Sequence, residues 1–184
     1  MKTLTLTILS VLAALQLQAQ GYVNVNNVLS GLVYTNSGVN TGLVGNGYLA
    51  QLYLGAANEV EANLVSNPTT IPFLGVGLEG FFGDFTVVLV NTFVIGGTPG
   101  TFQVRAFPDT FSTYAQAYAA ALGDPHILVG KSAVFQNATG NNLPSALSLD
   151  MMPSFTLVVV PEPSAVFLCG LGAAMLLWQY RRRA

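Results

Sequence analysis

The C-terminal residues contain an uncharged stretch that limits what the rest of the chain can fold into. Residues 164–180 carry no charged side chain, and Arg181, Arg182 and Arg183 follow directly. At about 1.5 Å per residue a helix of this length spans roughly 25 Å, just enough to cross a hydrocarbon core. A buried helix of a soluble domain is the alternative, but such helices usually keep one polar stripe. We therefore expect a transmembrane helix over 164–180. The basic tail 181–184 then lies on the cytoplasmic side and the preceding residues on the other.

Two prolines stand directly before this stretch. Pro161 and Pro163 each fix their own φ and lack an N–H, and each restricts the residue before it to extended geometry. The Pro-Glu-Pro triplet is therefore predicted to be extended and stiff, with Glu162 at the outer interface. An enzyme could recognise such a peptide in its cleft. The simpler alternative is a helix stop with a short spacer.

Together these parts carry a family resemblance. The run Val160-Pro161-Glu162-Pro163-Ser164, followed by an apolar span and an arginine cluster, resembles a PEP-CTERM sorting signal over about the last 25 residues. Proteins with this signal resemble substrates of exosortase, a membrane-embedded cysteine transpeptidase of Gram-negative bacteria that make extracellular polysaccharide and biofilm. The resemblance implies removal of the tail near residues 161–163, with release or attachment at the cell surface. It implies no fold or activity for the residues before the signal.

The N-terminus has the pattern of a secretory signal peptide. Lys2 supplies a positive charge, residues 4–17 are mostly apolar, and Ala19 offers a small residue for cleavage. Signal-peptide cleavage favours a small residue two positions before Ala19, and Leu17 there is large. The cleavage site is therefore predicted only to within a few residues. We expect a signal peptide over 1–19 and an exported domain over 20–160. A first membrane span is the alternative, and the modest length of the apolar stretch disfavours it.

The charges of this central segment exclude some functions. Residues 21–160 hold seven acidic and two basic residues: Glu59, Glu61, Glu79, Asp84, Asp109, Asp124 and Asp150, against Arg105 and Lys131. Nucleic-acid binding needs clustered lysine and arginine, so we expect no nucleic-acid partner. The single cysteine, Cys169, lies in the apolar tail, so the segment must be held by packing without a disulfide.

The periodicity of the segment predicts a mainly β fold. Residues 22–26, 49–54 and 101–107 alternate with period two, whereas 84–95 are too apolar for a strand with one solvated face. We expect 84–95 to form a central strand, or two strands with a bend at Asn91, and to pair with 101–107 in a hairpin across a Gly/Pro turn. Weaker strands are predicted over 126–129, 132–136 and 154–160. The whole predicts a single antiparallel β-sandwich-like domain.

One short helix is predicted within this domain. Thr113 and Gln116 fit a capping box. Tyr114, Tyr118 and Leu122 then share one helix face, which we expect to pack on the sheet. Gly123 is expected to end the helix in a left-handed turn, and Pro125 prevents its continuation.

Candidate catalytic groups are few. His126 is the only histidine, and a hydrolase would need it to face a serine and a carboxylate. With one histidine and no cysteine, residues 21–160 are not expected to form a zinc site, and no metal or cofactor is expected. Glu59 and Glu61 would point the same way from a strand, which allows glycosidase chemistry or calcium binding but also fits a solvated edge. The triplet at Asn137 matches a glycosylation sequence and is interpreted as a turn.

Arg105 is the remaining candidate for a ligand contact. It lies in an alternating strand, opposite in phase to Phe102, Val104 and Ala106. It could recognise a carboxylate or a sugar, with Tyr48 or Tyr53 stacking beside it. Alternatively, it is an outward-facing arginine paired with a neighbouring carboxylate.

These observations predict an exported, non-enzymatic surface or extracellular-matrix protein. The expected partners are an exosortase-type transpeptidase, the secretion machinery, the lipid bilayer through residues 164–180, and extracellular polysaccharide. The precursor would be anchored in the inner membrane with its C-terminus cytoplasmic, and the product would be at the cell surface or outside the cell. The alternatives are a carbohydrate-binding module, a secreted hydrolase, and a permanently anchored protein that is never trimmed.

Overall fold

A computed structural model describes residues 21–36, 41–83, 87–89, 96–140 and 146–160 of the chain. The predicted signal peptide, the Pro-Glu-Pro triplet, the predicted transmembrane helix and the basic tail lie outside these residues. Within them, no helix has the length and apolar character needed to cross a membrane.

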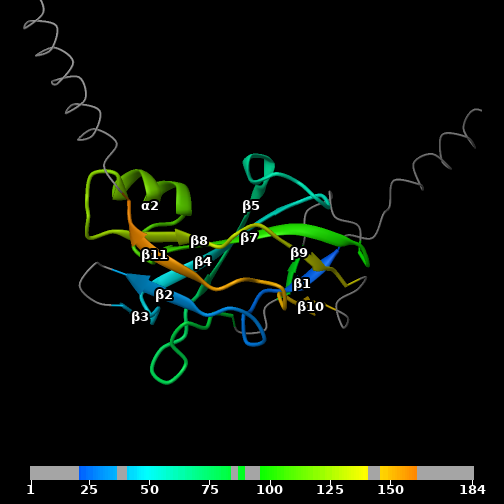
Figure 1. Ribbon diagram of the computed structural model, residues 1–184, viewed down its shortest axis with the longest axis horizontal. Helices are drawn as coiled ribbons and strands as arrows, with labels where there is room; N and C mark the ends of the chain where they lie inside the picture. The colour runs from blue at the N-terminus through cyan, green and yellow to red at the C-terminus, as the bar shows by residue number, and fades with distance from the viewer. Residues whose placement is uncertain (1–20, 37–40, 84–86, 90–95, 141–145, 161–184) are drawn as a thin grey trace, which may run out of the picture.

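The described residues form a mainly β structure with one α-helix, as the periodicity predicted (Figure 1). The helix is α2 (Tyr114–Ala121), and a 3-10 turn, η1, covers Glu61–Asn63. The strands are β1 (Tyr22–Asn24), β2 (Val33–Asn36), β3 (Thr41–Leu43), β4 (Tyr48–Gly55), β5 (Val65–Pro72), β6 (Val87–Leu89), β7 (Pro99–Pro108), β8 (Leu128–Lys131), β9 (Phe135–Ala138), β10 (Leu147–Ser148) and β11 (Phe155–Val159).

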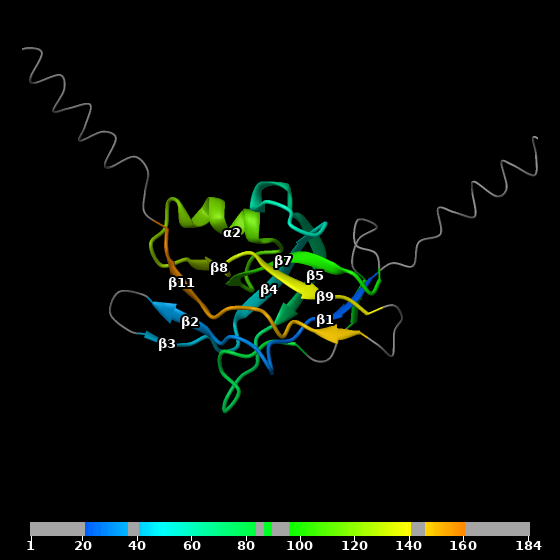
Figure 2. The same cartoon turned by 45° about the vertical axis from the view of Figure 1, so that its right-hand side comes forward.

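The strands form two sheets. The larger has the order β3-β2-β11-β8-β7-β4-β5, with β9 also paired to β7, and the smaller has the order β10-β1-β6. Figures 1 and 2 show β1 and β10 beside β9 at one end of the molecule. Most pairs are antiparallel, but β11 runs parallel to β2, and β10 runs parallel to β1. The prediction of a purely antiparallel domain is therefore wrong, because the last two strands pair with the first two rather than with chain neighbours.

The strand before β7 is not its hairpin partner. β7 pairs with β4 along Thr101–Pro108 on one edge, and with β9 and β8 in succession on the other edge. Ser132 lies between β8 and β9 in the chain, and its Oγ accepts a hydrogen bond from Val104 N of β7 at 3.1 Å. β6 instead pairs with β1 and lies at the end of the smaller sheet among the described strands. The remainder of the predicted strand over 84–95 lies outside the described residues.

The main core lies on one face of the larger sheet. Alternate residues of β7 and β4 point into it, including Phe102, Val104 and Leu52, and β1 adds Val23 from the smaller sheet. A second, smaller cluster lies on the opposite face beneath α2, and includes Phe107 and Val129. The larger sheet is therefore covered by apolar side chains on both faces.

The helix starts as predicted but packs through a different face. Thr113 Oγ1 accepts from Gln116 N at 3.3 Å, and Gln116 reaches back to Ser112 N rather than to the cap residue. The buried residues are Tyr114, Ala117 and Ala121, because small alanines let the helix approach the sheet closely, whereas Tyr118 is 43% exposed. Gly123 does not adopt the predicted left-handed conformation.

The described chain enters and leaves at opposite ends of the molecule (Figures 1 and 2). Val160, the last described residue, is buried in the cluster beneath α2 directly after β11. The predicted processing motif therefore begins where the packed domain ends.

Candidate functional site

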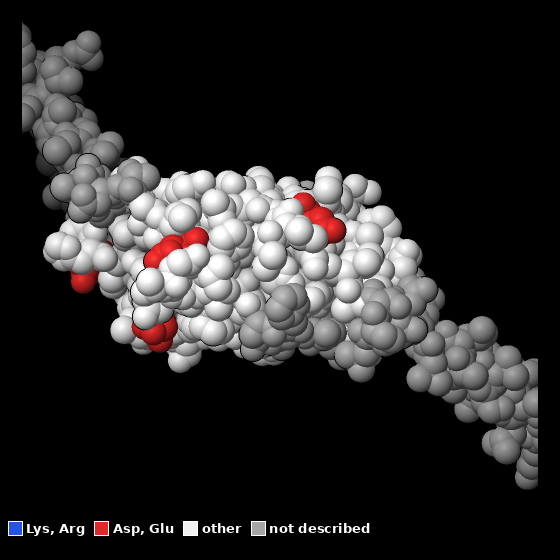
Figure 3. Space-filling model, turned by 90° about the horizontal axis from the view of Figure 1, so that it is seen from below, with Lys and Arg blue, Asp and Glu red and all other residues white. Residues whose placement is uncertain are grey.

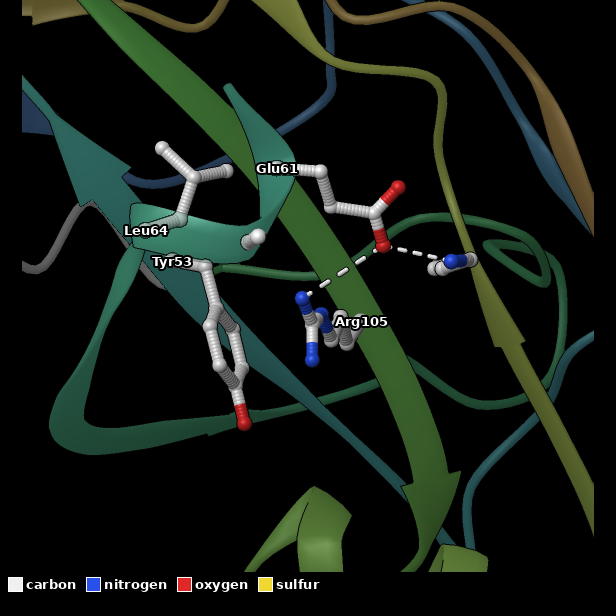
Figure 4. A pocket seen from close by; sticks show the side chains of 6 residues that line it. Tyr53, Glu61, Leu64 and Arg105 are labelled. Carbon is white, nitrogen blue, oxygen red and sulfur yellow. Dashed lines mark hydrogen bonds and ion pairs between the residues drawn. The ribbon is translucent and has the colours of Figure 1, made fainter. Parts of the chain in front are cut away.

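An open pocket of about 540 Å³ lies on the face of the larger sheet that α2 also covers (Figure 4). It is lined by Tyr53, Glu61, Ala62, Leu64, Arg105 and Lys131. The three residues from strands come from β4, β7 and β8, and the other three come from η1 and the residue after it.

Strand register brings the polar residues together. Arg105 on β7 lies opposite Gln51 on β4 and opposite Lys131 on β8, while Tyr53 lies opposite Gln103. Residues directly opposite each other share a sheet face, so these five side chains form one polar row. Two like charges, Arg105 and Lys131, are adjacent across strands, which is unfavourable unless an anion lies between them.

Contacts on several sides hold Arg105 in place. Its Nε donates to Gln103 Oε1 at 2.8 Å. The guanidinium carbon lies 3.7 Å from the centroid of the Tyr53 ring and 5.3 Å from that of Tyr114. The side chain is 17% exposed, so these cation–π contacts are largely shielded from water. The Arg105 guanidinium therefore covers one face of the Tyr53 ring, which we had expected to stack beside Arg105 on a bound ligand.

Glu61 supplies the anion between the two cations. Its Oε1 lies 3.6 Å from Arg105 Nη2 and also accepts a hydrogen bond from Lys131 Nζ. The hydrogen bond from Lys131 lowers the pKa of the Glu61 carboxyl, with a contribution from Gln103, against the opposing effect of partial burial. With two cations and one carboxylate, the site has a local charge of +1 in a domain that is otherwise acidic.

The two glutamates have separate roles because they do not lie in a strand. Glu59 Oε1 accepts from Asn63 Nδ2 at 2.8 Å and so stabilises the turn. Thr101 holds the same turn over the sheet, since its hydroxyl donates to Ala56 O at 2.6 Å and accepts from Glu59 N at 3.0 Å. Gly55 is required here, because a Cβ would come within 2.9 Å of Glu59 and Leu64. The paired-carboxylate hypothesis is therefore not supported by the geometry.

Tyr48, the other predicted stacking residue, lies away from the pocket. Its side chain packs against the main core, whereas Tyr53 packs in the cluster beneath α2 on the opposite face of β4. Burial raises the pKa of the Tyr48 hydroxyl. Five positions separate the two tyrosines, and an odd separation along a strand puts side chains on opposite faces.

The remaining candidates do not gather into a site. His126 is exposed, and Asp124 Oδ1 accepts from the backbone N–H of His126 at 2.8 Å, as in an Asx turn. Asn137 is buried, and its amide donates to Ser148 O at 3.0 Å, so it is not available for glycosylation as the structure stands. The described residues contain no group of three or more His, Cys, Asp or Glu that could hold a metal ion. The predicted motif residues 161–164 and 181–183 lie outside the described structure.

The sequence did not predict that Lys131 and Glu61 form a site together with Arg105. Lys131 and Glu61 are 70 residues apart, and the pairing of β4, β7 and β8 together with the turn after β4 brings them into contact. One signal was present in the sequence, because Arg105 and Lys131 are the sole cations of residues 21–160.

Comparisons of the chain with protein-family models, with curated proteins and with solved structures gave no match in any of the three.

Proposed function

We propose that this chain is an exported, non-enzymatic surface or extracellular-matrix protein that is delivered by a C-terminal sorting signal. The observation that carries the proposal is the order of three parts: Val160-Pro161-Glu162-Pro163-Ser164, the uncharged residues 165–180, and Arg181 to Arg183. An exosortase-type transpeptidase would recognise the stiff motif and remove the tail.

The position of the last strand supports this proposal. β11 lies between β2 and β8 in the larger sheet, and Val160 is packed beneath α2. In the sequence, the Pro-Glu-Pro triplet at 161–163 follows Val160 directly. Tail removal at the motif would therefore leave the packed strand intact, which suits a domain that must remain folded after processing.

Mass spectrometry of the mature C-terminus tests the proposal directly. The full-length gene is expressed in a bacterium that contains an exosortase-type enzyme, and the product is recovered from membrane, surface and medium fractions. A product that ends between Val160 and Ser164 is expected. A product that retains Arg183, or an unprocessed precursor dissolved in the cytosol, would overturn the proposal.

A matched pair of variants makes the test specific. Glu162→Gln removes the single carboxylate of the motif and is expected to cause the uncut precursor to accumulate in the membrane fraction. Glu79→Gln makes the same change on an exposed loop, where the carboxylate contacts Gly77 N, and processing is expected to be unchanged. Equal processing of both variants would remove Glu162 from the recognition motif.

The pocket favours a second candidate function, a carbohydrate-binding module. Arg105, Lys131 and Glu61 offer charged donors and an acceptor around an open hollow, with Leu64 and Ala62 as apolar walls. Retention of the full-length protein on immobilised polysaccharides tests this function, and loss of retention in Lys131→Gln would place the ligand in the pocket. Without retention on any polysaccharide, this candidate is rejected.

A further inference from the structure

Donors from the sheet converge on one carboxylate. Arg105 Nη2 and Lys131 Nζ both approach Oε1 of Glu61, and Figure 4 shows their two interactions ending on the same oxygen. The Lys131 contact is a charge-assisted hydrogen bond, which is shorter and stronger than a neutral one, and the Arg105 contact at 3.6 Å is an ion pair.

These donors are held by the sheet. Gln103 is 1% exposed, and its amide both donates to Ser132 O at 3.0 Å and accepts from Arg105 Nε. Tyr53 supports the guanidinium from the side. The arrangement is therefore a preorganised receptor, in which little side-chain freedom remains to be lost on binding.

The carboxylate itself comes from the surface. Glu61 opens a three-residue turn in which no residue is buried, and its side chain is 40% exposed. Its neighbour Ala62 is exposed, and together with Leu64 it forms the rest of the pocket wall. The half-exposed Glu61 side chain can rotate away while Thr101 keeps the turn, with Ala62 and Leu64, in place.

The charge distribution favours an anionic ligand at this one place. Arg105 and Lys131 are the two basic residues between Gly21 and Val160, against seven acidic ones. Figure 3 views the domain from below, and its described surface shows acidic side chains without a lysine or arginine. An anion would therefore be repelled over most of the domain and attracted at the pocket.

We propose that Arg105, held in place by Gln103, and Lys131 form a carboxylate-binding site for an acidic sugar, and that Glu61 is an internal occupant which a uronic acid unit replaces. The proposal rests on the second candidate function, carbohydrate binding. The ligand carboxylate takes the place of the Glu61 carboxylate, and the sugar ring lies against Ala62 and Leu64. Because Glu61 is tethered to the site, it competes at a high effective concentration and weakens binding by the unaltered protein.

The test compares two forms of one glycan. Full-length protein in uncharged detergent is titrated by calorimetry with oligogalacturonate and with the same oligomer after methyl esterification, which removes the charge and keeps the sugar. Glu61→Gln removes the internal competitor and is expected to tighten binding of oligogalacturonate on the order of tenfold or more. The esterified oligomer should bind weakly to both proteins.

Three further variants locate the site. Lys131→Gln and Arg105→Gln are each expected to weaken oligogalacturonate binding in the Glu61→Gln background. Lys131 is half exposed, so its variant is expected to fold even if the Arg105 variant does not. Glu79→Gln removes the same charge from an exposed loop and should leave affinity unchanged. If Glu79→Gln and Glu61→Gln tighten oligogalacturonate binding equally, the effect comes from the change in net charge alone, and the proposal is overturned.

The outcomes separate the proposal from the function beneath it. If esterified and acidic oligomers bind the Glu61→Gln protein equally, carbohydrate binding stands and the carboxylate site is rejected. Another outcome is that free glucuronate binds Glu61→Gln only while Lys131 is intact, with no binding of any oligomer or polysaccharide. In that case the carboxylate site stands and the module function is rejected. If neither the acidic glycan nor the free uronate binds Glu61→Gln, both are rejected.

Discussion

The two faces of β7 are both buried, but by different chemistry. On one face Phe102, Val104 and Ala106 are fully buried in the main core. On the other face Gln103 and Arg105 are covered by α2 and by the turn at η1, and their polar groups are satisfied by hydrogen bonds, ring contacts and an ion pair. Alternation along a strand therefore reports which residues share a face, and it does not report whether that face is solvated.

The apolar face should give the largest stability effect. Phe102→Ala is expected to lower the unfolding free energy by about 3–5 kcal/mol, because removal of the ring would leave a cavity. Phe102 is 0% exposed, and its ring centroid lies 6.1 Å from that of Phe135. Val158→Ala, at a 44% exposed position of β11, should change stability by about 0.5 kcal/mol or less. Denaturant unfolding measures both. A loss below about 1 kcal/mol for Phe102→Ala would contradict its position in a packed core.

A substitution on the polar face of β7 should give the second-largest loss of stability. Gln103→Met keeps the side-chain volume but leaves Ser132 O and Arg105 Nε without their partner, so a cost of about 1–3 kcal/mol is expected. Gln136→Met removes the same amide from an exposed position that donates to Thr101 Oγ1, where water can replace it. Its cost should be less than half as large. Equal costs would show that the Gln103 hydrogen bonds are no better shielded than surface ones.

The local parts of this fold were predictable from the sequence, and the covering of its faces was not. Thr113 and Gln116 lie three residues apart, so the helix start could be predicted from spacing alone. The phase of Arg105 was also correct. Its contact with Glu61 depends on how β4, β7 and β8 align and on where the turn after β4 folds, and neither follows from period two.

One wrong prediction has this cause, and a misplaced candidate has another. The hairpin before β7 was inferred from turn residues, but β9 occupies the edge of β7 that starts at Pro99, while β4 occupies the other edge from Thr101 onward. Tyr48 was offered as an alternative to Tyr53 for stacking beside Arg105, although the odd separation of the two tyrosines already placed them on opposite faces. Turn chemistry indicates where the chain reverses, and competition among strands decides what it then pairs with.

The helix that covers the polar face should respond to alkaline pH. Burial raises the pKa of Tyr114 from 10.0 to about 12, with smaller effects from Arg105 and the neighbouring tyrosines. The folded state holds this proton more tightly than the unfolded state, so its stabilising effect is complete below pH 10 and is lost as pH rises toward 12. A shift of this size corresponds to at most about 2.7 kcal/mol, which solvent screening reduces to about 1–2 kcal/mol.

Tyr114→Phe isolates this effect, because every other ionisable group is the same in the two proteins. The difference in unfolding free energy between the two proteins is expected to be steady below pH 10 and to shift in favour of the phenylalanine variant above it. Tyr118→Phe, at a more exposed ring stacked on Tyr114, serves as the control. A parallel loss of stability in Tyr114→Phe and the unaltered protein would show that Tyr114 is not the group responsible.

Removing the Glu61 carboxylate from the turn that completes the polar face should change stability least. Its effect should be lost in acid, whereas that of Tyr114 is lost in alkali. The carboxyl pKa of Glu61 is lowered, chiefly by the hydrogen bond from Lys131, so the ion-pair contribution is complete above the ordinary value of about 4.5 and is lost as pH falls below it. The side chain is 40% exposed, so the contribution at neutral pH should be below about 1 kcal/mol. Glu61→Gln should therefore be slightly less stable than the unaltered protein at pH 7, and the difference should close by about pH 3 and in about 1 M salt. If the gap instead widens in acid, the carboxylate of Glu61 is not what holds the turn against Arg105 and Lys131, and the site would have to be held by Thr101 alone.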